Sequence, residues 1–162
     1  MSEATGVSGS EQSENPEMAI TYHWLHGQLL PADLADMQTL MLFLTTKRVN
    51  LTTEVVERAM SGGWVCVARC EQGRIIGMIT ITPVHTIQGS FGYVSNFVIH
   101  ADFQGQGIGP KLHRLALERL NLQRCELTSN PERTQAHHVY QKLGYTKRVT
   151  EVFTLDIPSR RT

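Results

Sequence analysis

The sequence lacks the surplus of positive charge that nucleic-acid-binding proteins usually carry. Its 162 residues include 15 Lys and Arg against 15 Asp and Glu, so the formal net charge is zero. Basic pairs such as Lys147-Arg148 are short and isolated, as on an ordinary solvated surface. Because binding to nucleic acid depends on a basic patch or stripe, we expect no nucleic-acid partner.

Long apolar runs are also missing. The longest clean run extends from Leu40 to Leu44, whereas a membrane-spanning helix needs about 20 apolar residues. The first residues are polar and acidic, without the basic start and apolar stretch of a targeting signal. The sequence therefore predicts no membrane association and a cytoplasmic location.

Cysteine is scarce, and its spacing is uninformative. Cys66, Cys70 and Cys125 form no C-x-x-C pair, which argues against a disulfide framework and against a zinc knuckle. The adjacent His137 and His138 would point in different directions on a helix, and no H-E-x-x-H motif is present. We predict no metal site.

Composition divides the chain into a core and two tails. Residues 1–18 are rich in Ser, Glu and Gly, and such a segment buries too little apolar surface to offset its ordering entropy, so we expect a disordered tail. Residues 159–162 form a second, short tail. The length of the remainder favours one domain over residues 19–158, and an apolar fraction of 41% with 19% charged residues is ordinary for a globular domain.

Periodicity and turn residues predict alternating helices and strands. Leu34, Met37, Leu40 and Leu44 recur at helical spacing behind Pro31, and the β-branched runs around Gly73 are typical of a hairpin. The expected strands cover residues 19–27, 64–69, 75–82, 91–99, 123–129 and 145–157. The expected helices cover residues 31–44, 51–60, 109–122 and 131–142, the last with Pro131 in its first turn, and residues 83–90 are expected to form a loop.

This order predicts an α/β fold, a single domain with a mixed, mostly antiparallel sheet flanked by helices. Strict alternation along residues 91–99 gives this strand two faces. One face would carry Tyr93, Ser95, Phe97 and Ile99, and the other Val94, Asn96 and Val98.

A glycine-rich loop precedes the helix expected from residue 109. Glycines 105, 107 and 109 alternate there, and a bare backbone at a helix start lets several N–H groups converge on a phosphate or pyrophosphate. The dinucleotide motif G-x-G-x-x-G fails because Pro110 occupies its last position. The motif G-x-x-x-x-G-K-[ST] fails because Leu112 follows Lys111.

The loop resembles a family signature. Gln104-x-x-Gly107-x-Gly109 is similar to the Q/R-x-x-G-x-G/A signature of the GNAT superfamily of acetyl-CoA-dependent N-acetyltransferases. Downstream, residues 136–145 resemble the family's A-x-x-x-Y-x-x-x-G-[FY] motif through Ala136, Tyr140 and Gly144-Tyr145. The element order agrees over residues 20–157, so the resemblance implies the fold of this family.

The resemblance also implies a binding mode for acetyl-CoA. In this family the signature loop holds the pyrophosphate, the preceding strand pairs with the pantetheine arm, and a backbone N–H near Ile99 polarises the thioester carbonyl. The residues that would bind the cofactor here are Gln104, Gly105, Gln106, Gly107, Ile108 and Gly109 in the loop, and Phe97, Val98 and Ile99 in the strand. Two positions depart from the family pattern. Pro110 follows the last glycine and lacks an N–H. Arg133 stands where many members have Asn, and it would make a further contact to the pantetheine arm or to the substrate.

The resemblance assigns catalytic residues as well. An amine attacks directly, and Tyr140 would protonate the leaving thiolate, although its apolar neighbours Ala136 and Val139 also fit an ordinary core tyrosine. Asn96 would hold a water or the substrate, since an amide cannot act as a base. The general base stays open, with His85 as a candidate.

The acceptor is expected near Leu42, Phe43 and His85, where the family places it. The reading we favour is N-acetylation of a primary amine of a small molecule. Two alternatives remain: acetylation of a protein N-terminus or lysine, and a catalytically silent module that binds acetyl-CoA. Because dimers are frequent in the family, a homodimer is also possible.

Overall fold

A computed structural model describes residues 19–157. The predicted tails, residues 1–18 and 159–162, lie outside the described part. The chain divides into two compact units, the first ending at Glu126 and the second beginning at Leu127.

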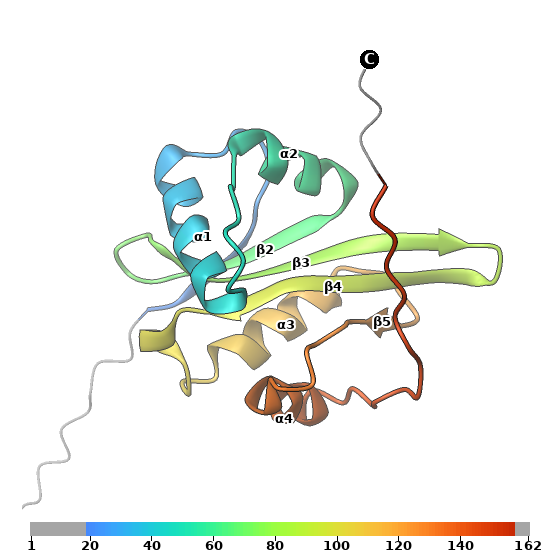
Figure 1. Ribbon diagram of the computed structural model, residues 1–162. Helices are drawn as coiled ribbons and strands as arrows, with labels where there is room; N and C mark the ends of the chain where they lie inside the picture. Colours follow the sequence, from blue (N-terminus) through green and yellow to red (C-terminus); the bar gives the residue numbers. More distant parts are fainter. Residues whose placement is uncertain (1–18, 158–162) are drawn as a thin grey trace, which may run out of the picture. The chain divides into compact units, whose positions relative to one another are not determined.

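The first unit contains a five-stranded sheet in the order β1-β2-β3-β4-β5 (Figure 1). Its strands are β1 (Thr21–Trp24), β2 (Trp64–Arg69), β3 (Ile75–Thr86), β4 (Gly89–Ile99) and β5 (Cys125–Glu126). The first four pair antiparallel, and β5 pairs parallel with β4. The predicted mixed, mostly antiparallel sheet is confirmed.

Helices cover both faces of this sheet: α1 (Pro31–Leu44) and α2 (Thr53–Gly62) lie on one face and α3 (Ile108–Glu118) on the other (Figure 1). Pro31 stands in the first turn of α1, where its missing N–H breaks no helical hydrogen bond. The Thr52 hydroxyl caps α2 by accepting a hydrogen bond from the Val55 N–H at 3.3 Å. Both helix starts therefore follow from local sequence signals.

A cluster of apolar side chains forms the core between α1, α2 and the sheet. Met37 and Leu40 of α1 and Val56 of α2 pack there on strand residues that include Val67 and Met78. On the other face, α3 buries Ile108, Leu112 and Ala116. The sheet is thus buried on two sides, which holds β4 and the start of α3 in fixed positions.

The loop predicted for residues 83–90 is wrong. Both strands continue through it, with Thr86 opposite Gly89, so that β3 and β4 form a long hairpin closed at Ile87 and Gln88. Pro83 is tolerated because β2 pairs with β3 only as far as Ile81, which leaves one edge of β3 without a strand at Pro83.

Predictions for the carboxyl-terminal third were less accurate. The strand predicted over residues 123–129 shortens to β5, and α3 ends at Glu118. In the second unit, α4 (Thr134–Lys142) begins after a turn in which the Asn130 side chain accepts a hydrogen bond from the Glu132 N–H at 2.9 Å. The strand predicted over residues 145–157 is also wrong, since this segment pairs with no strand of the described chain.

The cysteines are free thiols, with Cys66 and Cys70 buried and Cys125 partly buried. Among the helices of residues 19–157, none combines the length and the apolar character that crossing a membrane requires.

Candidate functional site

The glycine-rich loop leads from a short 3-10 helix, η1 (Ala101–Phe103), into α3. Gly105 and Gly107 both have φ of +76°, and Gly107 is the N-cap of the helix. Side chains disfavour this left-handed conformation, so the loop shape depends on glycine at both positions. A Cβ at either position would meet no atom within 4 Å, which shows that open space borders the loop.

The amides of this loop point to an anion site. Within the described part of the chain, no acceptor is present for the N–H groups of Gly105, Gln106, Gly107, Ile108 and Gly109. The flanking amides are satisfied, because Gln104 donates to the Ala101 carbonyl at 3.3 Å and Lys111 to the Gly107 carbonyl at 3.2 Å. A run of free amides at the positive end of a helix is suited to bind phosphate oxygens.

Side chains fix this loop to the end of β4. The Gln104 Nε2 donates to the Ile99 carbonyl at 2.9 Å, and the Gln106 Nε2 donates to the Asp102 carbonyl at 3.4 Å. Ile108 is buried and can offer a ligand only its backbone. Gly109 lies against Phe97 and Ile99, where an added Cβ would make ordinary contacts of 3.5–3.6 Å.

A β-bulge interrupts β4 near its end, before η1 and this loop. Thr80 pairs with Ser95 but Met78 pairs with Val98, so Asn96 and Phe97 share one position opposite β3. Asn96 adopts a left-handed φ of +49°, and its Nδ2 lies 3.5 Å from the buried Thr80 hydroxyl. A bulge of this kind redirects a side chain and weakens strand pairing, both of which suit a binding site.

The bulge also corrects the predicted faces of β4. Directly paired residues share a face, so Ser95 lies on the same face as Thr80, and Val98 on the same face as Met78. Ser95 and Val98 therefore point to one side, although strict alternation had placed them on opposite sides. Phe97 points to the α3 side, where its ring lies 5.7 Å from the ring of His113.

The predicted binding edge of β4 continues past its parallel neighbour. In the described sheet, β5 pairs with β4 at Gly92 and Tyr93, whereas β4 continues to Ile99. The segment that contains Phe97, Val98 and Ile99 thus lies beyond the β4–β5 pairing.

The residues predicted near the acceptor are not all brought together. Leu42 and Phe43 lie at the exposed end of α1, and the Phe43 ring contacts the His100 ring at 4.9 Å. His85 lies at the far end of the β3–β4 hairpin, where its Nδ1 is 2.7 Å from the Ser90 hydroxyl. Ser90 and His100 are separated by about 30 Å of strand, so one small acceptor cannot contact both Phe43 and His85.

His100 is a residue that the sequence patterns missed. Its ring lies between Phe43 and Phe103, 6.0 Å from the latter, and its Nδ1 accepts a hydrogen bond from the Asp102 N–H at 3.3 Å. It therefore joins the end of α1 to the turn that begins the glycine loop. The sequence did contain a local signal for His100: a polar residue directly before a short turn is a typical N-cap.

The second unit contains the remaining candidates, Tyr140 and Arg133. Tyr140 is half-buried on α4, with its ring 6.0 Å from the Tyr145 ring. Burial raises the pKa of the Tyr140 phenol, and the charge of Arg133 opposes that rise. At neutral pH the phenol therefore holds its proton, as a proton donor must. Arg133 occupies the N-cap position of α4.

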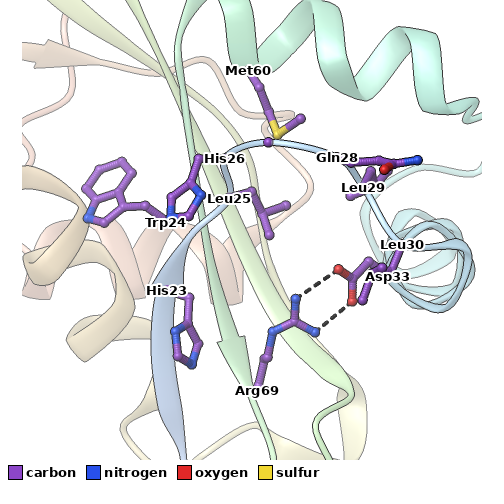
Figure 2. Close-up of a pocket in the computed structure, with 11 residues that line it drawn as sticks. His23, Trp24, Leu25, His26, Gln28, Leu29, Leu30, Asp33, Met60 and Arg69 are labelled. Carbon is purple, nitrogen blue, oxygen red and sulfur yellow. Dashed lines mark hydrogen bonds and ion pairs between the residues drawn. The ribbon is translucent and has the colours of Figure 1, made fainter.

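A pocket of about 250 Å³ lies elsewhere in the first unit, between β1, the β1–α1 connection and α1 (Figure 2). Arg69 forms one wall, donating to both carboxylate oxygens of the buried Asp33 at 2.7 and 3.0 Å, and to the Gly73 carbonyl at 2.9 Å. This pair links α1 to β2 and takes up most of the guanidinium's hydrogen-bonding capacity. We interpret the pair as structural.

Three solved structures resemble the chain. A glucosamine-6-phosphate N-acetyltransferase from Arabidopsis thaliana is 17% identical, with a TM-score of 0.63 over 83% of this chain and 98% of that one. An aminoglycoside N-acetyltransferase in complex with CoA is 13% identical, with a TM-score of 0.71 over 88% and 97%. A ribosomal-protein-alanine N-acetyltransferase from Brucella melitensis is 15% identical, with a TM-score of 0.65 over 86% and 100%.

At these identities the likeness shows the fold. No curated protein matches the chain in sequence. The sequence profile of the acetyltransferase (GNAT) family, however, matches residues 22–145, which include the glycine loop, the bulged strand and Tyr140. The chain therefore belongs to the GNAT family of acetyltransferases.

Proposed function

We propose that the protein transfers the acetyl group of acetyl-CoA to a primary amine of a small molecule, by direct attack of that amine. One observation carries the proposal: the run of amides over residues 105–109 that have no acceptor in the described chain, at the amino end of α3 and joined to the bulged strand through η1. Such a site fits a pyrophosphate, and family membership makes CoA the pyrophosphate compound to test first.

The chain's own residues would divide the binding between them. The backbone of Gly105, Gln106, Gly107, Ile108 and Gly109 would hold the pyrophosphate, while Gln104 keeps the loop attached to β4. The backbone of Phe97, Val98 and Ile99 would pair with the pantetheine arm. Arg133 would contribute a polar contact to the arm or to the acceptor.

The proposed chemistry needs a positioned amine and a proton donor. The C–N bond forms as the C–S bond of the thioester breaks; the amine loses a proton, and the departing thiolate gains one. Asn96, held by the bulge, would position the amine or a water, and an N–H near Ile99 would stabilise charge developing on the thioester oxygen. Tyr140 would supply the proton to sulfur, since its raised pKa keeps it protonated.

Small-molecule acceptors are supported by two of the structural relatives, whose names specify an amino-sugar phosphate and an aminoglycoside. The third relative, by its name, acetylates alanine of a ribosomal protein, so protein termini stay the second candidate. Tyr140 argues against a third possibility, a silent module that only binds acetyl-CoA.

The first experiment measures thermal unfolding with acetyl-CoA, ATP or NAD. A ligand that binds only the folded protein raises the unfolding temperature, so we expect a rise with acetyl-CoA and not with the other two. Release of free thiol in the presence of amines and of peptides then identifies the acceptor class. Burial raises the pKa of the Cys66 thiol to about 11, so this thiol should stay silent in the assay. No rise at saturating acetyl-CoA would refute the proposal.

A further inference from the structure

The charge of the segment between α1 and α2 points to a class of acceptor. This inference rests on the proposed function. Lys47 and Arg48 are exposed there, and no carboxylate of the described chain pairs with either. They form a positive segment in the part of the first unit where the acceptor is expected.

The segment is held in a defined conformation. The Gln38 side chain, from the middle of α1, donates to the Val49 carbonyl at 2.9 Å and accepts from the Leu51 N–H at 3.0 Å. The Lys47 N–H donates to the Thr45 hydroxyl at 3.1 Å. Hydrogen bonds therefore hold the backbone on both sides of the two cations. Because the segment is already ordered, it would lose less conformational entropy when an anion binds.

The segment also starts beside the end of β4. Phe43 contacts His100, the residue between β4 and η1, and Figure 1 shows the end of α1 beside the end of β4. Lys47 follows Phe43 by four positions, so its Cα lies within roughly 14 Å of the Phe43 Cα. A long basic side chain at that position can reach a small molecule that approaches the end of β4 from the α1 side.

Within residues 31–53, no free carboxylate offsets these cations. Residues 31–53 contain two acidic side chains, Asp33 and Asp36. Asp33 is bound by Arg69, and Asp36 lies 3.6 Å from Arg74 and accepts the Ile75 N–H at 2.8 Å. Lys47 and Arg48 would repel a polycationic amine, and residues 31–53 offer it no free carboxylate.

We infer that the acceptor amine carries an anionic group, a carboxylate or a phosphate, that Lys47 and Arg48 recognise, and that polycationic amines are poor acceptors. Both groups accept charge-assisted hydrogen bonds from lysine and arginine, and arginine can bind either in a bidentate manner. A matched series of acceptors distinguishes the two sources of charge.

The test measures acetylation of pairs that differ in one anionic group: alanine against alaninamide, and phosphoethanolamine against ethanolamine, with spermidine as the polycation. We expect kcat/KM to be at least about tenfold higher for the anionic member of one pair, which identifies carboxylate or phosphate. Preferred acetylation of ethanolamine, alaninamide or spermidine would overturn the inference and leave the proposed function intact. Failure to acetylate any amine would overturn both.

Charge-removing variants locate the recognition. Lys47→Gln and Arg48→Gln should each raise the KM for the preferred anionic acceptor about three- to tenfold, with smaller effects on its neutral partner and on the KM for acetyl-CoA. Arg58→Gln, which removes an exposed cation of α2, is the matched control and should leave all three constants unchanged. If Lys47→Gln and Arg48→Gln raise the KM for acetyl-CoA instead, the segment binds the cofactor and the inference is wrong.

Discussion

Replacing Gly107 by alanine tests the glycine loop at its most constrained point. Gly107 has a φ of +76° and stands at the N-cap of α3, between amides that have no acceptor in the described structure. An alanine there must either keep a left-handed backbone or shift it. Either response changes the directions in which the neighbouring N–H groups point.

The cost to stability should be moderate. A left-handed conformation costs an L-residue about 1–2 kcal/mol relative to its preferred backbone. The added methyl group meets no atom within 4 Å, so no steric term adds to that cost. For a protein of this size, we expect the unfolding temperature of Gly107→Ala to fall by about 2–8 °C.

The effect on cofactor binding should be larger. If the backbone shifts, a phosphate oxygen loses at least one charge-assisted hydrogen bond, worth about 1.5–3 kcal/mol. The dissociation constant for acetyl-CoA should then rise roughly ten- to a hundredfold. Isothermal titration calorimetry measures this constant, and thermal unfolding of the same samples separates binding from stability.

Gly109→Ala is the matched control in the same loop. Gly109 lies in the helix without a positive φ, and its new methyl group would contact Ile99 and Phe97 at ordinary distances of 3.5–3.6 Å. We expect near-wild-type stability and affinity. Equal losses in both variants, or none in Gly107→Ala, would refute the link between the left-handed glycine and the anion site.

Three further perturbations follow from the structure. Tyr140→Phe should lower kcat about 10²- to 10⁴-fold with little change in the KM for acetyl-CoA; thiol release at unchanged rates over the whole pH range would remove the acid role. Arg69→Met should lower the free energy of unfolding by about 3 kcal/mol, since it leaves the carboxylate of Asp33 buried without its partner; urea unfolding measures this, and Arg69→Met/Asp33→Leu should recover part of the loss. Burial lowers the pKa of His113, so the unfolded chain takes up a proton that the folded protein does not, and stability should fall as the pH drops below about 6.5. His113→Leu should flatten that slope in urea titrations, and an unchanged slope would contradict this account.

Elements with a clear period and clear boundary residues could be predicted closely. The helix over residues 31–44 has Pro31 at its start and an apolar repeat, and α1 has the same limits. The strand over residues 64–69 and its hairpin turn at Gly73 were also correct. In these segments local propensity and burial favour the same structure, so one sequence window contains the necessary information.

The bulge in β4 could not be predicted in this way. Alternation assumes one residue opposite one partner, and the extra residue at Asn96 reverses the faces beyond it. The hint in the sequence was small: asparagine tolerates a left-handed φ better than its neighbours Ser95 and Phe97 do. What determines the bulge is non-local: Val98 must join the core with α1 on the same face as Ser95, three residues earlier, which strict alternation does not allow.

In the second unit, the sequence predicted a strand that does not form. The apolar residues Val149, Val152 and Phe153 have strand propensity, yet the segment pairs with no strand of the described chain. Strand propensity is realised only where a neighbouring strand satisfies the backbone. A prediction from propensity alone assumes that partner, and here the assumption was wrong.

Pro110 departs from the family pattern, but the start of α3 accommodates it. The first amides of a helix have no partner within it, and in α3 the first satisfied amide is that of Lys111, bound to the Gly107 carbonyl. Pro110 therefore removes no hydrogen bond from the helix, and its fixed φ favours the helical first turn. The proline withdraws one donor from the end of the anion site, while the amides of residues 105–109, in the loop that two left-handed glycines shape, have no acceptor in the described chain. The sequence departs from the family pattern at a position where helix geometry tolerates it, and the free amides before Pro110 are the groups expected to bind the pyrophosphate.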